Sequence, residues 1–245
     1  MFSTLLNNIR DAAQNGTAPD CFAAEVIRAQ EEAQFTDNEA AYVVGTMFEA
    51  GSGTTAAALQ TLLLALTVFA DVSELANEEL DRVCGDRIPT FDDFNDLPYI
   101  QAVVKETLRW RPVTAGGFPH LLIKDDTYNG YHLPAGTVVI PNSWAIHLDP
   151  ERYPDPDRFH PSRFLDSSFP TGPQPGADLN TSDTSVGRGH WAFGFGRRAC
   201  PGQHIADRSL FIAAARILWA FKVTKALDAA GNEIEVDTLR YTTGE

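Results

Sequence analysis

A glycine-rich loop around Cys200 holds the residues of this chain that are best suited to chemistry. Residues 193–202 contain two glycines before the cysteine, and Pro201 and Gly202 follow it where an amphipathic helix is expected to begin. Such a loop can fold tightly around a sulfur with backbone N–H groups directed at it, and the following helix N-terminus adds positive potential. Both effects favour the thiolate, the form that binds a metal. Cys200 is therefore a candidate metal ligand.

Two other interpretations remain open on this loop alone. Residues 194–199 match the dinucleotide-binding fingerprint G-x-G-x-x-A, although no strand run precedes them and no β-α-β unit surrounds them. The second alternative is that Cys200 is a buried structural cysteine in a turn. The remaining cysteines, Cys21 and Cys84, are distant in sequence, so neither a zinc knuckle nor a disulfide framework is indicated and a reducing compartment fits best.

The whole decapeptide resembles the haem-thiolate signature of the cytochrome P450 family, F-x-x-G-x-R-x-C-x-G. Every fixed position of that signature is present, and these five positions are the candidate cofactor-binding residues: Phe193, Gly196, Arg198, Cys200 and Gly202. The resemblance implies that Cys200 is the axial ligand of the iron, that Arg198 pairs with a haem propionate and that Phe193 packs beside the thiolate. The implied cofactor is haem b, iron protoporphyrin IX.

Glu106 and Arg109 lie three residues apart, on one face of an expected helix. Taken alone, they form an ordinary exposed pair that contributes little to stability. In the family, such a pair is buried and joined by a second arginine downstream. Residues 159–164 resemble that downstream segment and make Arg163 the third member. The resemblance implies a structural triad that locks the cysteine loop.

Residues 50–55 resemble the oxygen-activating A-G-x-[D/E]-T-T segment of the family. The resemblance implies that Gly51 lets the helix distort above the haem and leaves room for O2. It also implies that the Thr54 hydroxyl holds the water that supplies protons. Helix packing through small residues is the alternative. Because Gly53 replaces the usual acid, we expect a shortened proton relay and poor coupling of reducing equivalents to product.

The chain departs from the family a second time at Leu121. The family often has an arginine after the Pro-His pair, and that arginine contacts a haem propionate; this chain has Leu121 after Pro119 and His120. His120 is therefore a candidate for the propionate contact.

The expected elements form a mainly α fold with a small antiparallel β region, the C-terminal half of the cytochrome P450 fold, so residues 1–245 are one partial domain. One long helix over residues 36–70, roughly 50 Å at about 1.5 Å per residue, opens with a capping box from Thr36 to Glu39. Its glycines at 45, 51 and 53 indicate a close neighbour. The other expected segments are weak helices over 1–35, a helix over 72–83, the E-x-x-R helix over 98–111, a β region and loop meander over 113–190 with strands at 121–124, 131–133 and 137–140, and the cysteine loop with its following helix over 191–221.

The charge distribution indicates a protein partner rather than nucleic acid. The formal charge is −14, and a chain this acidic is not expected to bind nucleic acid, which needs clustered Lys and Arg. Residues 187–225 nevertheless carry a local balance of +6, against −20 for the rest. Such a patch would steer an acidic flavoprotein reductase, with Arg197 and Arg208 as candidate contacts. Internal pairing of these arginines is the alternative.

The resemblance implies a monooxygenase of the eukaryotic microsomal type. It would insert one atom of O2 into a small apolar organic substrate, using electrons from NADPH that a separate flavoprotein reductase delivers. Residues 113–118 would line one wall of the substrate pocket. Two rivals stay open: a truncated, catalytically inactive fragment that retains only the haem-binding loop, and a haem-thiolate isomerase that needs no electrons.

The N-terminal sequence reaches Arg10 and Asp11 before any long apolar run builds, which argues against a normal signal peptide. The most apolar stretch, residues 56–70, is too short to span a bilayer, so we expect no transmembrane segment in this chain. An intracellular protein is expected, and the resemblance implies that its full-length form lies at the endoplasmic reticulum membrane through an N-terminal anchor not contained here.

Overall fold

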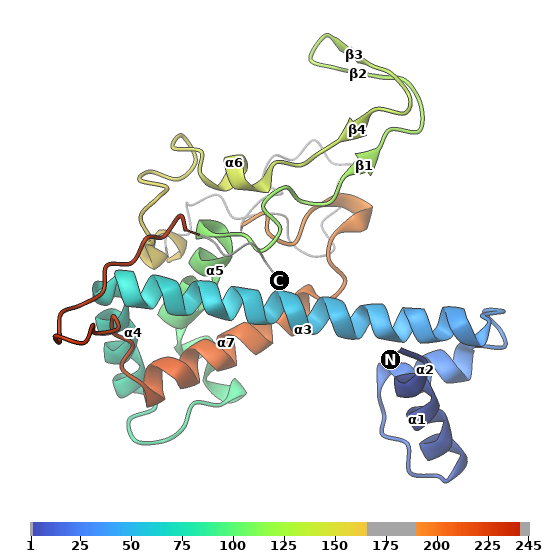
Figure 1. The fold of residues 1–245 in the computed structure, drawn as a ribbon, viewed down its shortest axis with the longest axis horizontal. Coiled ribbons are helices and arrows are strands. Elements are labelled where there is room, and N and C mark those ends of the chain that lie inside the picture. The colour runs from blue at the N-terminus through green and yellow to red at the C-terminus, as the bar shows by residue number, and fades with distance from the viewer. Residues whose placement is uncertain (1, 166–189, 241–245) are drawn as a thin grey trace. The chain divides into compact units, whose positions relative to one another are not determined.

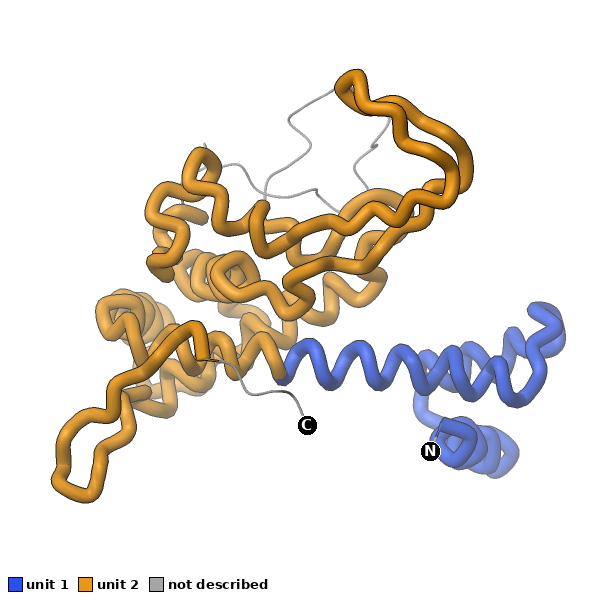
Figure 2. The backbone as a smooth tube through the Cα atoms, turned by 45° about the horizontal axis from the view of Figure 1, so that its top comes forward, with its two compact units in different colours: residues 1–56 blue, residues 57–245 orange. Residues whose placement is uncertain are grey.

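The computed structural model describes residues 2–165 and 190–240 (Figure 1). The predicted fold class, mainly α with a small antiparallel β region, is confirmed. The chain divides into two compact units, residues 1–56 and residues 57–245 (Figure 2), and the expectation of one partial domain stays a prediction. The elements in chain order are α1 (Phe2–Gln14), α2 (Phe22–Ala29), α3 (Asp37–Val68), α4 (Ala70–Val83), η1 (Phe91–Asp96), α5 (Pro98–Trp110), β1 (His120–Leu121), β2 (Asp126–Tyr128), β3 (Tyr131–Leu133), β4 (Val138–Val139), α6 (Ser143–His147), η2 (Pro161–Phe164), η3 (Gly196–Arg198) and α7 (Gln203–Ala220).

The long helix α3 begins with the predicted capping box. The Glu39 carboxylate accepts the Thr36 backbone N–H at 2.9 Å, and the Thr36 hydroxyl accepts the Glu39 N–H at 3.2 Å. Both bonds satisfy groups that a helix start leaves unpaired, which explains why α3 begins here.

Only one of the three glycines in α3 has the close neighbour that we expected. A Cβ at Gly45 would collide with the Phe2 ring, so glycine lets α1 approach α3 there. At Gly51 and Gly53 a Cβ would meet nothing within 4 Å. Helix α3 runs through both positions without a break, and the distortion expected at Gly51 stays a prediction. The Ser52 and Thr54 hydroxyls bond back to the carbonyls of Phe48 and Ala50, a pattern that often bends helices.

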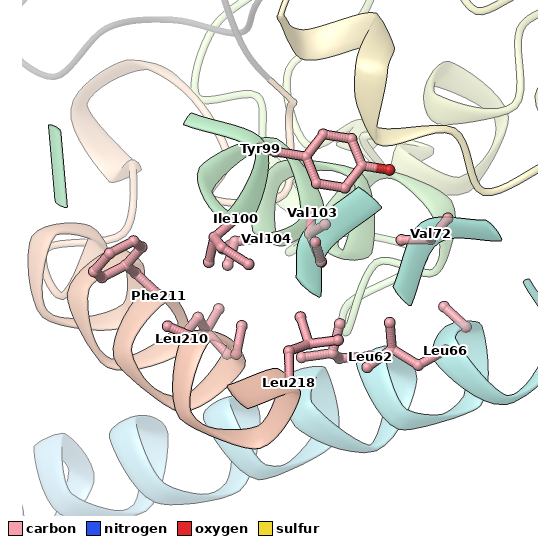
Figure 3. Close-up of a cluster of buried hydrophobic side chains, with 14 of the residues drawn as sticks. Leu62, Leu66, Val72, Tyr99, Ile100, Val103, Val104, Leu210, Phe211 and Leu218 are labelled. Carbon is pink, nitrogen blue, oxygen red and sulfur yellow. The ribbon is translucent and has the colours of Figure 1, made fainter. Parts of the chain in front are cut away.

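The core of residues 57–245 lies between the C-terminal part of α3 and helices α4, α5 and α7 (Figure 3). Each element presents apolar side chains at helical spacing toward the others. Each fully buried Leu, Ile, Val or Phe contributes about 1.5–3 kcal/mol. The central members, drawn in Figure 3, are Leu62, Leu66, Val72, Ile100, Val103, Leu210, Phe211 and Leu218.

Helix α5 is fixed at both ends. Pro98 occupies its first turn, and the Glu79 carboxylate on α4 accepts the N–H groups of Tyr99 at 3.0 Å and Ile100 at 3.1 Å. The helix ends at Trp110, one residue before the expected end, because Arg111 precedes a proline and takes an extended φ of −140°. These restraints fix the position of Glu106 and Arg109 on α5.

The β region differs in detail from the prediction. The structure pairs β1 with β4 and β2 with β3, both antiparallel. Strand β3 has the predicted bounds, whereas β2 was missed and the first strand is His120–Leu121 rather than 121–124. The predicted turn at Asn129 and Gly130 is present, with φ of 48° and 83°. Positive φ at both positions defines the tight hairpin turn, and this turn imposes β2 on the polar segment before it.

By length and composition, α3 could cross a bilayer, with a mean hydropathy of 1.2 and 22% of its apolar window buried. This finding differs from the expectation that the apolar stretch is too short, because the helix extends that stretch toward its N-terminus. A lone helix of this kind is weak evidence for a membrane span, since the core helices of soluble proteins have the same composition.

Candidate functional site

The cysteine loop is closed by its own backbone. The Cys200 N–H donates to the Phe193 carbonyl at 2.9 Å, and the Gly194 N–H donates to the Trp191 carbonyl at 3.0 Å. Gly194 and Gly196 both have φ of 70°, a backbone region that favours glycine. These two glycines, of which Gly196 is a fixed position of the signature, thus provide the turns that bring Phe193 back to the cysteine.

The Cys200 thiol is exposed, so the interpretation as a buried structural cysteine is wrong. The expected N–H donors to sulfur are also absent among residues 2–165 and 190–240. The Cys200 N–H bonds to the Phe193 carbonyl, and the Ala199 N–H bonds to the Gly196 carbonyl at 3.1 Å. Gly202 lies close to the sulfur, since a Cβ there would be 3.9 Å from Sγ. The thiol is therefore available to an external group.

The dinucleotide-binding alternative does not fit the fold. Its fingerprint must connect a parallel strand to a helix in a β-α-β unit. Both sheets of the described chain are antiparallel, and the loop follows no strand of either sheet.

His120 lies next to the cysteine loop. Its ring stacks on Phe195, with centroids 6.4 Å apart and planes inclined by 13°. The Trp191 ring makes an edge contact with Phe195, with centroids 6.1 Å apart. The structure therefore brings His120 into the neighbourhood of the loop, although β1, which carries it, is distant in sequence.

The arginines around the loop differ in how far they are engaged. Arg197 and Arg198 are exposed and form no ion pair within the described ranges. The Arg208 guanidinium lies 4.1 Å from the centre of the Phe94 ring, a cation–π contact. Lys225 pairs with Glu233 and Glu235, at 3.4 and 3.8 Å, and so adds little to the expected positive patch. Arg188, another member of that patch, lies outside the described residues.

Glu106, Arg109 and Arg163 form one buried network, rather than the exposed pair that the spacing alone suggests. Arg109 donates from Nε to Glu106 Oε2 at 2.7 Å and from Nη2 to Oε1 at 2.9 Å, and Arg163 Nε donates to Oε1 at 3.1 Å. The His160 N–H also donates to Oε1, at 2.7 Å. Glu106 and Arg109 are completely inaccessible to solvent, so the two guanidiniums and the backbone donor compensate the desolvation of the carboxylate.

His147 connects this network to the cysteine loop, and the sequence analysis missed it. Its carbonyl accepts from Arg109 Nη1 at 2.8 Å, and its imidazole Nε2 accepts from the Trp191 N–H at 2.7 Å. The ring is fully buried, and burial, with the Arg109 charge as second cause, lowers the pKa of His147 to about 4. The imidazole is therefore neutral. In the sequence, His147 stands out only as a histidine just before a proline-rich loop. This is a weak indication of a role at the cysteine loop, because its partner Trp191 lies 44 residues further along the chain.

Thr54 and Gly51 lie in the unit of residues 1–56, whereas the cysteine loop lies in the unit of residues 57–245. The Thr54 hydroxyl donates to the Ala50 carbonyl at 2.5 Å, and both site residues are exposed. Thr54 Oγ1 keeps its lone pairs, so it can accept a hydrogen bond from another group.

The described residues fit a haem group and do not fit a multidentate metal site. No cluster of three or more His, Cys, Asp or Glu side chains that could hold a metal ion occurs in the described part of the chain. Haem iron can be held by one protein thiolate, and its propionates need positive partners. The exposed Cys200 thiol can supply the thiolate, and the exposed Arg198, two residues earlier and without an ion pair in the described part of the chain, can supply the positive charge.

Comparisons with known proteins all lead to one family. Residues 2–235 match the cytochrome P450 family. Cytochrome P450 monooxygenase virE of Hypocrea virens is 45% identical over 236 residues, which cover 95% of this chain and 42% of that protein. Cytochrome P450 monooxygenase fogE of Aspergillus ruber is also 45% identical, over 89% of this chain and 39% of that protein. A solved structure of a zebra fish cytochrome P450 with progesterone has a TM-score of 0.65 and 32% identity, covering 78% of this chain and 40% of that chain.

The chain belongs to the cytochrome P450 family. It spans about two fifths of the length of the curated relatives it matches.

Proposed function

We propose that this chain is the haem-binding portion of a monooxygenase that inserts one atom of O2 into a small apolar organic substrate. The observation that carries the proposal is the exposed Cys200 thiol, held in a loop that the Phe193–Cys200 backbone bond closes. When bound, a thiolate-ligated haem supplies the electron-rich iron that favours O–O cleavage.

The loop residues have separate roles in this proposal. Cys200 provides the axial thiolate, and Arg198 balances the charge of a propionate, since the described residues give its guanidinium no other partner. His120, stacked on Phe195, is the second candidate for a propionate. Gly196 and Gly202 leave room for the turn and for the sulfur. The triad of Glu106, Arg109 and Arg163 holds the segments behind the loop.

Thr54 and Gly51 are proposed to handle the proton and the space for O2. The Thr54 oxygen accepts a hydrogen bond from water while its own hydroxyl group donates to the Ala50 carbonyl. To donate its proton to another group, the Thr54 hydroxyl must break its hydrogen bond to the Ala50 carbonyl. Position 53 is a glycine, so no carboxylate there can supply the proton in place of Thr54. This supports the expectation of poor coupling.

Electrons are proposed to come from NADPH through a flavoprotein reductase that docks at Arg197 and Arg208. Both side chains are exposed, which supports the proposal, whereas Lys225 is already paired. The full-length form is proposed to act at the endoplasmic reticulum membrane.

The test is the spectrum of the haem-loaded chain, reduced and exposed to carbon monoxide. We expect a thiolate-shifted Soret band that Cys200→Ser abolishes. Cys21→Ser, which removes another cysteine without a side-chain hydrogen bond, should leave the band unchanged. An unaltered spectrum in Cys200→Ser would refute the proposal.

The rival function is a chain that retains the haem loop without turnover. The apolar side chains that the β region leaves exposed, including Phe118 at 74% and Ile123 at 87%, favour it, because a substrate pocket needs such surfaces covered. Substrate oxidation with reductase and NADPH separates the two: a thiolate-type band without product supports the rival.

A further inference from the structure

The segment of residues 190–200 has one hydrogen-bonded anchor to the preceding chain. Within the described residues, the Trp191 N–H donates to His147 Nε2 at 2.7 Å, and every other hydrogen bond of the segment stays within it or leads forward into α7. Ring contacts, such as His120 on Phe195, restrain the segment less directionally. Ala192 and Phe193 also pack against the hydrophobic core, but within the described residues a single imidazole nitrogen supplies the hydrogen bond that ties the start of the cysteine loop to the preceding chain.

His147 is itself fixed by the buried network. The Arg109 guanidinium holds the His147 carbonyl at 2.8 Å and is in turn held by Glu106 at 2.7 Å. A continuous path of buried hydrogen bonds thus runs from Glu106 through Arg109 and His147 to Trp191. From there, the turn at residues 191–194 and the Phe193–Cys200 bond lead to the thiol.

The imidazole has the tautomer that this path requires. Because Nε2 accepts a hydrogen bond, the proton must lie on Nδ1. His147 Nδ1 is buried and has no hydrogen-bond partner in the described chain. An unpaired buried donor is unfavourable, so a side chain chosen for packing alone would be apolar. The acceptor at Nε2 is what an apolar side chain would lack.

We infer that His147 is a positioning residue, whose neutral imidazole transmits the rigidity of the Glu106–Arg109 network to the loop that presents Cys200. The inference rests on the proposed function for its consequence at the haem. Without the imidazole, the loop start loses its directional hydrogen bond to the preceding chain, and the thiol would be held less rigidly in the position needed to bind the iron.

The test uses His147→Phe, which keeps a ring of similar size and removes the acceptor. His147→Gln provides the rescue, because its side-chain oxygen reaches the same distance along the chain and can accept from Trp191. His132→Phe serves as a control, since His132 lies exposed on β3.

The first measurement needs no cofactor. Hydrogen exchange at the Trp191 amide of the full chain should be faster by about tenfold or more in His147→Phe, the factor expected for the loss of one hydrogen bond. The rate should return toward that of the unaltered chain in His147→Gln. Equal exchange in the unaltered chain and in His147→Phe would overturn the inference.

The second measurement is the fraction of thiolate-type Soret band in the reduced, carbon monoxide-bound protein. We expect this fraction to fall in His147→Phe and to recover in His147→Gln, with far-ultraviolet circular dichroism unchanged. A full thiolate fraction in His147→Phe contradicts the inference and leaves the proposed function intact. A protected Trp191 amide without any thiolate band in the unaltered chain contradicts the proposed function and leaves the anchor intact.

Discussion

Arg109 Nη1 donates a 2.8 Å hydrogen bond to the carbonyl oxygen of His147, a residue 38 positions further along the chain. The same guanidinium holds both carboxylate oxygens of Glu106. One buried side chain therefore connects α5 to the C-terminal end of α6, from which the imidazole of His147 reaches the cysteine loop. This relationship makes the network at Glu106 part of the candidate site, although none of its atoms contacts Cys200 in the described residues.

Removing the charge of Glu106 should destabilise the fold. Glu106→Gln keeps the size of the side chain but removes the charge that the buried Arg109 and Arg163 guanidiniums share, and breaking such a buried ion pair costs about 3–5 kcal/mol. Urea unfolding should show this as a lower midpoint with an unchanged slope. Glu74→Gln on the exposed face of α4 should change stability by no more than about 0.5 kcal/mol. A loss below about 1 kcal/mol in Glu106→Gln would mean that the network is not maintained in solution.

The free energy of unfolding should decrease as the pH falls below 6.5, at a pH where most carboxylates are still ionised. Burial lowers the pKa of His147 to about 4 and that of His190 to about 3, from an ordinary 6.5. A lowered histidine pKa means that the unfolded state binds the proton first, so stability is complete above pH 6.5 and declines toward pH 4. His147 alone should cost about 2 kcal/mol by about pH 5.

The groups that face His147 are Arg109 on α5, Tyr153 and His190, and the Arg109 charge opposes its protonation. The urea midpoint of unfolding should change less with pH in His147→Phe than in the unaltered chain. In His132→Phe its dependence on pH should be the same as in the unaltered chain. The same slope in both variants would assign the acid sensitivity to other groups.

Reversing the loop charges should slow reduction by a flavoprotein reductase. Arg197→Glu combined with Arg208→Glu replaces two exposed cations, and we expect the reduction rate to fall by at least about threefold at low salt, because steering depends on unscreened charge. Arg82→Glu on α4 is a charge-matched control. Stopped-flow reduction at low and high ionic strength measures the effect, and a deficit that persists in high salt would point to altered packing at Phe94 instead.

An acid at position 53 should improve coupling. Gly53→Asp restores the carboxylate that the family segment has before its threonine, and a Cβ there meets nothing within 4 Å. In the full-length enzyme we expect hydrogen peroxide release per NADPH to fall by about twofold or more, since a positioned proton donor contributes about 10²-fold or more to the step it serves. Gly53→Asn controls for shape. Equal peroxide release in Gly53→Asp and the unaltered enzyme would remove proton supply as the cause.

Local spacing in the sequence was enough to identify the family and the cysteine loop. The positions of Phe193, Gly196 and Cys200 follow from a loop that bonds to itself across seven residues. The capping box at Thr36 and the hairpin turn at Asn129 depend on neighbours three or fewer residues away. Such features are determined by short-range sterics and hydrogen bonds, so the residue types alone specify them.

Only the tertiary structure decided which polar groups meet. The spacing of Glu106 and Arg109 is equally suitable for an exposed pair, and it is the packing of α5 against η2 and α7 that buries them. His147 and Trp191 lie 44 residues apart in the chain, and they meet because the hydrophobic core folds the intervening chain back. Burial is a collective result of that packing, and it converts ordinary histidine and arginine side chains into the supports of the site.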